Sequence, residues 1–174
     1  IVQHEAYLKV CACGHCTQAV FPGAVTAPIS YGASVQGLAA YFHTRQYLPY
    51  ARMKELFSDV LNLPLSVGSL RNMIHRTAQK ARPFYEQIKN KLLQSSFVGS
   101  DETSVKVNGA TNWMWTWQNS QLTYIVHSKN RAFATIEEQF KDGFPYTVLQ
   151  HDRYACHFKT PAAGHQICLV HLLR

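Results

Sequence analysis

Apolar positions in the first half of the chain recur every three or four residues, which is the spacing of one buried helix face. Three such stripes predict helices that begin near Ala33 and after Ser66, with another between them. Ser66 is a suitable N-cap residue, and Pro49 ends the first helix. Pro83 fits the first turn of a fourth helix, over residues 84–93. The first half is therefore expected to be helical.

Beyond residue 96 the apolar positions fall on every second residue, which indicates β-strands. Val105 and Val107 alternate ahead of Asn108-Gly109, a dipeptide typical of a tight hairpin turn. The predicted elements, in order, are strands over residues 97–100, 113–117 and 122–127, a helix over 131–140 and a strand over 146–149. The second strand contains Trp113, Trp115 and Trp117. Tryptophans in such a strand belong to the protein core more often than they form a surface for base stacking, so we expect these three to be core residues. We therefore expect an α+β chain, in which a helical region precedes a β-β-β-α-β core.

Two aspartates follow predicted strands of this core. Asp101 follows the first strand, and Asp152 comes just after the fourth. If these strands are parallel neighbours, both carboxylates emerge at the same edge of the sheet, where they can bind Mg²⁺ or a similar hard cation. An acid on strands one and four of a β-β-β-α-β order is the layout of a ribonuclease H-like core. Glu102, one residue along the chain, is expected to point elsewhere and to support the site at most.

Each acid also has a simpler interpretation when it is taken alone. Asp101 fits a turn or cap residue, and Asp152 fits a surface partner of Arg153. Their joint position at matching strand ends is what favours a metal site. Nearby side chains that suit phosphate contacts are Thr103, Lys106 and Arg153.

The predicted helix after Ser66 carries a basic and polar face opposite its apolar stripe. Two helices joined by a short turn, with a capped second helix, form a helix-turn-helix candidate, whose second helix reads base edges in DNA. The candidate DNA-binding residues are Ser69, Arg71, Asn72, Arg76 and Lys80. A helical hairpin that serves packing alone explains the same pattern.

The net charge of +7 is concentrated in the first half of the chain. Residues 1–96 hold ten Lys/Arg and four Asp/Glu, whereas residues 97–174 hold seven and six. A basic half suggests a module that binds a polyanion, although a solvated helical surface has the same composition. With 47% hydrophobic and 16% charged residues the chain is not of the disordered class, and no apolar run approaches the ~20 residues that cross a membrane.

Three cysteines lie close together near the start of the chain, at positions 11, 13 and 16. Cys13 and Cys16 have the CxxC spacing of a zinc knuckle, in which two thiolates share one metal across a turn that contains glycine. A closed site needs four ligands, and His4 and His15 are the nearby candidates for the rest. Free thiols are the alternative. An odd number of cysteines and the lack of a signal peptide favour a reducing, intracellular compartment.

Several stretches together resemble the IS66 family of bacterial transposases. They are FVGSDETSVKVNGATNWMWTW, HDRYACHFK and QICLVHLLR, together with the upstream FPGAVTAPISYGASVQGLAAYF and LPYARMKELFSDVLNLPLSVGSL and the cysteine cluster ahead of FP. The resemblance covers nearly the whole chain. Its specificity lies in the combination of DETSVKVNG, DRY and the closing His-Leu.

The resemblance implies a DDE transposase with a ribonuclease H-like catalytic core. Asp101 then matches the Asp of the family's DET motif, and Asp152 matches the Asp of DRY, so that these two acids would bind Mg²⁺ or Mn²⁺. The third acid is a Glu well downstream in the family, and a further cysteine pair of its zinc module lies upstream. Cys168 and His171 resemble the family's Cys-x-x-His element, and here they are assigned a structural role.

The resemblance also divides the chain and suggests where the protein acts. Residues 1–22 would be the remnant of a zinc-binding module, residues 23–96 a helical DNA-binding region, and residues 97–174 part of the catalytic core. We expect an internal segment of a transposase that binds double-stranded DNA at transposon ends, in the bacterial cytoplasm at the nucleoid, as part of a homo-oligomer when full-length. Lacking the third acid, the segment would be inactive alone. The alternatives are a non-catalytic DNA-binding module or repressor, and an inert relic that folds poorly.

Overall fold

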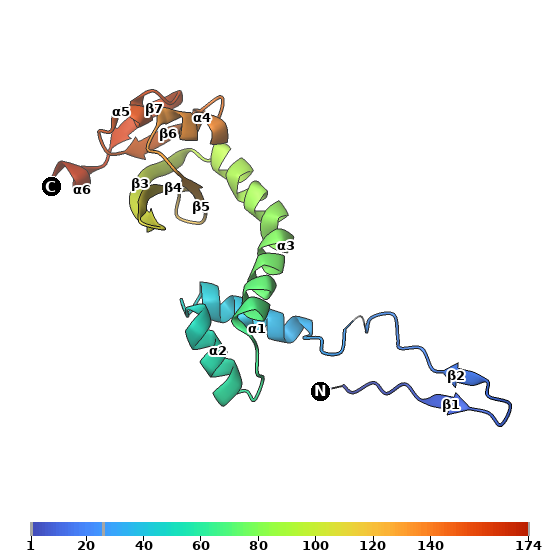
Figure 1. Cartoon of the computed structure of the whole chain (residues 1–174). Helices are drawn as coiled ribbons and strands as arrows, with labels where there is room; N and C mark the ends of the chain where they lie inside the picture. Colours follow the sequence, from blue (N-terminus) through green and yellow to red (C-terminus); the bar gives the residue numbers. More distant parts are fainter. Residues whose placement is uncertain (1, 26, 174) are drawn as a thin grey trace. The chain divides into compact units, whose positions relative to one another are not determined.

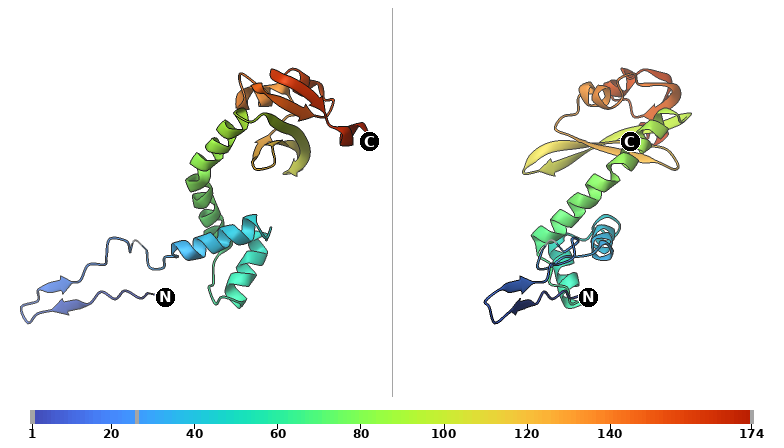
Figure 2. Two further views of the ribbon diagram at one scale, coloured as in Figure 1. Left: turned by 180° about the vertical axis from the view of Figure 1, so that it is seen from behind. Right: turned by 90° about the vertical axis from the view of Figure 1, so that its right-hand side faces the viewer.

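The computed structural model describes residues 2–25 and 27–173. The chain packs into two compact units, which we call the helical unit (Ile1–Gln79) and the sheet unit (Lys80–Arg174). This division falls inside a helix, whereas the domain boundaries expected from the sequence lie before residue 23 and after residue 96. Figures 1 and 2 show the elements of each unit.

The helical unit holds α1 (Ala33–Thr44), α2 (Tyr50–Asp59) and the first turns of α3 (Val67–Leu93). Their apolar stripes bury one small core, and its fully buried members are Ala39, Met53, Phe57, Leu65, Leu70 and Met73. Ser66 caps α3 as predicted, because its Oγ accepts a hydrogen bond of 3.0 Å from the Ser69 backbone N–H. The expected helical hairpin is therefore confirmed.

The fourth helix expected at Pro83 does not begin there. Instead, α3 continues through Pro83 to Leu93. Proline removes one N–H donor from a helix, and its ring crowds the preceding turn. Here residues 78–84 are all exposed, so water can solvate the carbonyl that loses its partner. Beyond them Tyr85, Ile88 and Leu92 bury the helix against the core of the sheet unit.

A small hairpin near the start of the chain pairs β1 (Leu8–Val10) with β2 (Cys16–Gln18) in antiparallel register. Its turn needs Gly14, whose φ of +81° lies in the left-handed region. The glycine-containing turn expected beneath the cysteines is therefore present. Both strands are exposed, and the hairpin holds a disulfide between Cys11 and Cys13.

The sheet unit is built on five strands in the order β5-β4-β3-β6-β7. The elements, in chain order, are β3 (Phe97–Val107), β4 (Ala110–Gln118), β5 (Thr123–Ser128), α4 (Phe133–Gln139), β6 (Phe144–His151), α5 (Ala155–Phe158), β7 (Ala162–Ile167) and α6 (Leu169–Leu172). The strands β3, β4 and β5 form an antiparallel meander, whereas β6 is parallel to β3 and to β7. The predicted α+β class and the ribonuclease H-like layout are confirmed.

Three features of the sheet differ from the elements expected. The first strand does not end at Asp101 but continues to the hairpin turn at Asn108-Gly109, where both φ angles are positive. A fifth strand, β7, pairs with β6, and its six residues show a weak alternation that no prediction covered. The short helix α5 lies between them.

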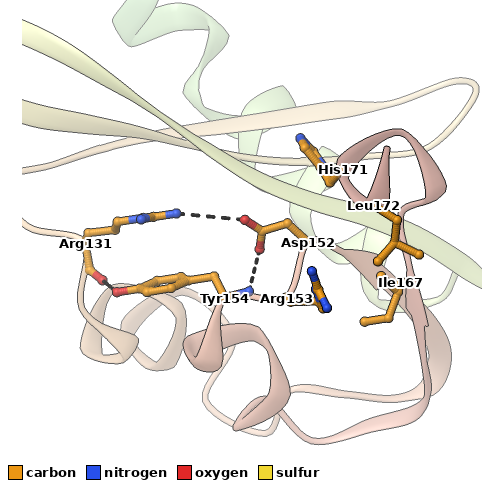
Figure 3. Close-up of a pocket in the computed structure, with 7 residues that line it drawn as sticks. All are labelled: Arg131, Asp152, Arg153, Tyr154, Ile167, His171 and Leu172. Carbon is orange, nitrogen blue, oxygen red and sulfur yellow. Dashed lines mark hydrogen bonds and ion pairs between the residues drawn. The ribbon is translucent and has the colours of Figure 1, made fainter. Parts of the chain in front are cut away.

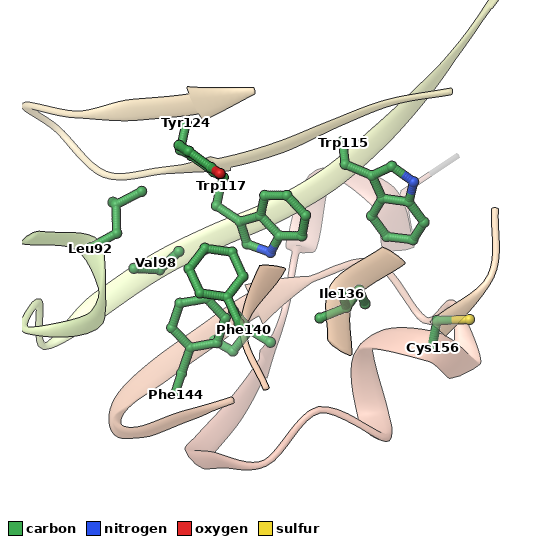
Figure 4. Packing of buried hydrophobic residues seen from close by; sticks show 10 residues of the cluster. Leu92, Val98, Trp115, Trp117, Tyr124, Ile136, Phe140, Phe144 and Cys156 are labelled. Atoms are coloured by element: carbon green, nitrogen blue, oxygen red, sulfur yellow. The ribbon is translucent and has the colours of Figure 1, made fainter. Parts of the chain in front are cut away.

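The core of the sheet unit forms where α4 and α5 pack on the side chains of the sheet, as Figure 4 shows. Trp115 and Trp117 are fully buried, so their predicted role as core residues is confirmed, while Trp113 is half-buried. The Trp117 ring meets Phe140 edge-on at 4.9 Å between centroids. These aromatic contacts pack the end of α4 against β4.

Candidate active site

The strands β3, which contains Asp101, and β6, which Asp152 follows, are parallel neighbours, and this meets the condition set in the sequence analysis. Gly99 of β3 pairs with Gln150 of β6. The pairing of the two strands ends at Gly99 and Gln150. Asp101 lies two residues beyond Gly99 on β3, which itself continues to Val107, and Asp152 lies two residues beyond Gln150, just after the end of β6.

Asp101 lies on the exposed part of β3, opposite Thr116 of β4. Its Oδ1 accepts a hydrogen bond of 3.0 Å from the backbone N–H of Glu102. Among the described residues, Asp101 forms no ion pair with a lysine, arginine or histidine. Its carboxylate is therefore accessible and not neutralised by a neighbouring cation.

Glu102 points to the opposite face of β3, because side chains alternate along a strand. Its side chain is completely buried, and both of its carboxylate oxygens have partners. Oε1 accepts from Arg131 Nε at 2.6 Å and forms an ion pair with Nη2, and Oε2 lies 2.9 Å from His157 Nε2. Since both oxygens are committed, Glu102 is not free to bind a metal ion.

Asp152 sits at the mouth of a pocket and shares the two partners of Glu102. Its Oδ1 accepts a hydrogen bond of 2.8 Å from the backbone N–H of Tyr154 and lies 3.8 Å from His157 Nε2. Its Oδ2 lies 3.9 Å from Arg131 Nη2, which is beyond hydrogen-bond distance. The side chain is one-quarter exposed, so the carboxylate is held in place but reaches solvent.

Arg131 links the buried acid to the exposed one. Its guanidinium lies over the Tyr154 ring at 3.9 Å, and the Tyr154 hydroxyl donates to the Arg131 carbonyl at 2.6 Å, as Figure 3 shows. Burial by itself would lower the pKa of Arg131, but the hydrogen bond and the charge of Glu102 raise it above its usual value. The guanidinium is therefore a fixed, permanent cation beside Asp152.

Two histidines, His151 and His165, form contacts at the end of β6. His151 is buried, and its Nδ1 is hydrogen-bonded to the backbone carbonyl of Asp152. Its Nε2 lies 3.0 Å from His165 Nδ1 on β7. Burial lowers the pKa of His151, against the opposing effect of the Asp152 carbonyl. These contacts fix the backbone from which Asp152 projects.

Arg131 and His157 were not among the residues expected at the site. Arg131 lies in the loop between β5 and α4, and His157 lies in α5, at sequence distances of 29 and 55 residues from Glu102. The only available signal was that His157 belongs to the quoted HDRYACHFK stretch. Of the expected phosphate contacts, Arg153 lines the pocket, whereas Lys106 donates to Thr111 at 2.7 Å and Thr103 is exposed on β3.

The donor set at this edge suits a hard divalent cation. Asp101 and Asp152 offer carboxylate oxygens, which are the ligands that Mg²⁺ and Mn²⁺ prefer. Within residues 2–25 and 27–173, no cluster of three histidine, cysteine, aspartate or glutamate side chains has metal-binding geometry. The Asp152 carboxylate lies near Arg131 and His157, the partners of Glu102, whereas Asp101 points to the other face of β3.

The residues expected to bind DNA lie along the first half of α3. Arg71, Asn72, Arg76 and Lys80 are exposed, opposite the face that buries Leu70. Ser69 is different, because its backbone N–H and its hydroxyl both interact with Ser66 Oγ at 3.0 Å. Its hydroxyl therefore belongs to the helix cap in this structure.

The cysteines expected to bind zinc do not form a ligand pair here. Cys13 is bonded to Cys11, and a sulfur in a disulfide is not a zinc thiolate. Cys16 is exposed and carries a free thiol. These residues as they stand do not fit zinc, and a site on Cys13 and Cys16 requires the reduced form.

Comparison with known proteins places this chain in a family. The model of the transposase IS66 family matches residues 29–174, which include both acids and all of the sheet unit from β3 onward. The chain belongs to the IS66 family of transposases. A search of curated proteins found no match. Membership of the IS66 family implies a transposase-related function and, in general terms, the binding of DNA.

No helix of the described residues is both long enough and apolar enough to cross a membrane. The longest, α3, carries basic and polar side chains along its exposed face.

Proposed function

We propose that this IS66 protein takes part in divalent-metal-dependent cleavage and transfer of DNA strands, with Asp101 and Asp152 as metal-binding acids. The observation that supports the proposal is the parallel pairing of β3 with β6, because each acid lies two residues beyond the last paired residue of its strand. Mg²⁺ or Mn²⁺, when bound, would activate a water or a 3′-hydroxyl for in-line attack on a phosphodiester.

The protein's own contribution is to hold the two carboxylates in different surroundings. Asp101 stays accessible and has no cationic neighbour within an ion pair's reach in the described chain. Asp152 is oriented by the Tyr154 N–H. Glu102 cannot take the place of Asp101, because Arg131 and His157 occupy its two oxygens.

Two carboxylates supply only part of the negative charge and of the protein ligands that two metal ions need for ordered binding. With so few protein ligands Mg²⁺ keeps its waters, because it dehydrates reluctantly. We therefore propose that a third acid, such as the downstream Glu that the family resemblance implies, completes the site. A polypeptide of residues 1–174 is then expected neither to cleave nor to join DNA at physiological Mg²⁺, even when it is folded and bound to DNA.

A supercoiled-plasmid nicking assay tests this expectation, with Asp101→Asn as the matched control. The plasmid carries the cognate transposon ends, and EDTA gives the background. Nicking by the parent polypeptide that disappears in Asp101→Asn would contradict the need for a downstream third acid, and it would show that an acid within residues 1–174 other than Glu102, such as Glu137, completes the site.

We further propose that the exposed face of α3 binds duplex DNA at transposon ends. The charge excess of residues 1–96 supports this, because four basic or polar side chains of that face are solvent-exposed. The same face would serve a non-catalytic DNA-binding protein or a repressor equally well. Self-association of the full-length protein and a place at the nucleoid are further expectations of this proposal.

Two substitutions on α3 distinguish recognition of the DNA sequence from electrostatic attraction to the DNA phosphates. Arg71→Ala is expected to weaken the preference for cognate over random duplex, because Arg71 lies in the first turns of the helix. Lys80→Ala is expected to weaken binding to all duplexes and to reduce the slope of log K against log salt by about one unit. Fluorescence anisotropy on both duplexes measures these effects. Equal, salt-independent losses from both substitutions would argue against a recognition helix.

A further inference from the structure

A pocket of about 350 Å³ opens beside Asp152, and its lining is cationic on one part and apolar on another. Arg131, Arg153 and His171 supply the basic part, Tyr154 adds an aromatic ring, and Ile167 and Leu172 supply the apolar part (Figure 3). Asp152 is the only acid of this lining in the described structure. The lining suits an anionic ligand that also carries apolar surface.

Arg131 is the lining residue whose side chain is held in place by other residues of the protein. Its Nε and one side of Nη2 are held by the buried Glu102, and its plane is stacked on Tyr154 at 3.9 Å and lies 5.0 Å from the Trp113 ring. Contacts on two sides fix the guanidinium before any ligand arrives, which reduces the entropy lost on binding. Its side chain is nevertheless 37% exposed, whereas Glu102 is completely buried.

The guanidinium keeps free donors on its exposed side. Arginine has five N–H groups, and Glu102 takes two of them. Asp152 takes none, because 3.9 Å is too long for a hydrogen bond. Arg153, on the same pocket, forms no ion pair within the described part of the chain. Two arginines with unused donors thus face one small cavity.

We propose that this pocket binds a phosphodiester group of a DNA strand, with Arg131 as a pre-positioned contact, the exposed Arg153 as a second contact and Glu102 as the anchor of Arg131. The planar fork of a guanidinium matches two phosphate oxygens. The apolar part of the lining would take the sugar that flanks the phosphate. The pocket is adjacent to Asp152, so this proposal rests on the proposed function and names how its substrate is held.

The proposal explains why a buried glutamate stands directly beside a candidate metal-binding aspartate. Both oxygens of Glu102 are held by Arg131 and His157, and through the first of these contacts Glu102 orients the arginine that lines the pocket. Glu102 is in this account a positioning residue.

The test is a titration of the intact polypeptide in EDTA, followed by two-dimensional NMR of the arginine Nε–Hε groups. The two probes are inorganic phosphate and the dinucleotide dTpdT, each compared with sodium chloride at matched ionic strength. Spectra of Arg153→Gln and Arg131→Lys identify the two signals, after tryptophan fluorescence has shown that each variant is folded. The wild-type titration requires neither variant to be stable.

The signals of Arg131 and Arg153 are expected to shift together and saturably with dTpdT, with a Kd on the order of 1 mM, while those of Arg45 and Arg52, which are exposed and outside every proposed site, do not saturate. Saturation by inorganic phosphate alone would show a free-phosphate site and overturn the assignment to DNA. Shifts that are equal for all arginines, or no shift, would overturn the site itself. Because no metal is present, failure here is distinct from failure of the acids to bind a cation.

Discussion

Replacing Glu102 with alanine is expected to destabilise the sheet unit by about 3 kcal/mol, because it removes one partner of a buried charge pair. His157 is completely buried and would lose its 2.9 Å contact with Oε2. Arg131 would lose its anchor, but its exposed part regains water, so we place the cost at the lower end of the range for such pairs. Urea unfolding measures this free energy.

Tryptophan fluorescence makes that measurement specific to the sheet unit, since all three tryptophans lie in β4. Glu138→Ala is the matched control, because Glu138 is exposed on α4 and its loss is expected to change the free energy of unfolding by less than about 0.5 kcal/mol. Glu102→Gln keeps the shape and one acceptor, and it should fall between the two. A Glu102→Ala protein as stable as Glu138→Ala would show that the buried pair adds nothing to the fold.

Replacing Trp117 with alanine is expected to cost about 3–5 kcal/mol, as other large core truncations do. The ring is fully buried and contacts Phe140 at 4.9 Å, Trp115 at 6.0 Å and Tyr124 at 6.1 Å between centroids. Its loss leaves a cavity between β4 and α4 that these rigid rings cannot fill.

Two further variants, one at Trp117 and one at an exposed ring, test this packing account. The indole N–H of Trp117 is buried and has no hydrogen-bond partner in the described structure, so Trp117→Phe loses apolar area alone and should cost roughly 1–2 kcal/mol. Tyr146→Ala removes an aromatic ring that is 84% exposed and should be close to neutral. Thermal unfolding followed by circular dichroism ranks the three. A Trp117→Ala protein as stable as Tyr146→Ala would refute the packing account.

Local signals in the sequence predicted local structure well. Asn108-Gly109 indicated a hairpin turn, and both residues have the positive φ that only such residues adopt easily. Ser66 indicated a helix start, and it makes the capping hydrogen bond. In each case the chemistry that specifies the structure is contained within four residues. Pro83 is the exception, because its effect on α3 depends on how exposed that stretch is.

The site was predictable only in part, because its contacts are long-range. The alternation of β3 correctly indicated that Asp101 and Glu102 point to opposite faces. That alternation does not reveal which residues contact each face. The partners of Glu102 are Arg131, from the loop before α4, and His157, from α5. Similarly β7 is an edge strand that pairs only with β6 among the described residues, so its sequence lacks the run of apolar residues that marks a parallel strand buried on both faces.

The most direct test of the central claim is whether Asp101 and Asp152 bind one divalent cation between them. Mn²⁺ is titrated into the intact polypeptide, and free Mn²⁺ is counted by electron paramagnetic resonance, which needs no DNA and no activity. Asp101→Asn and Asp152→Asn each remove one carboxylate ligand, and Asp142→Asn removes the same charge from an exposed turn of the same unit. We predict one saturable site that weakens at least roughly ten-fold in both Asp101→Asn and Asp152→Asn and is unchanged in Asp142→Asn. Mn²⁺ binding by Asp101→Asn that equals wild type would contradict the account.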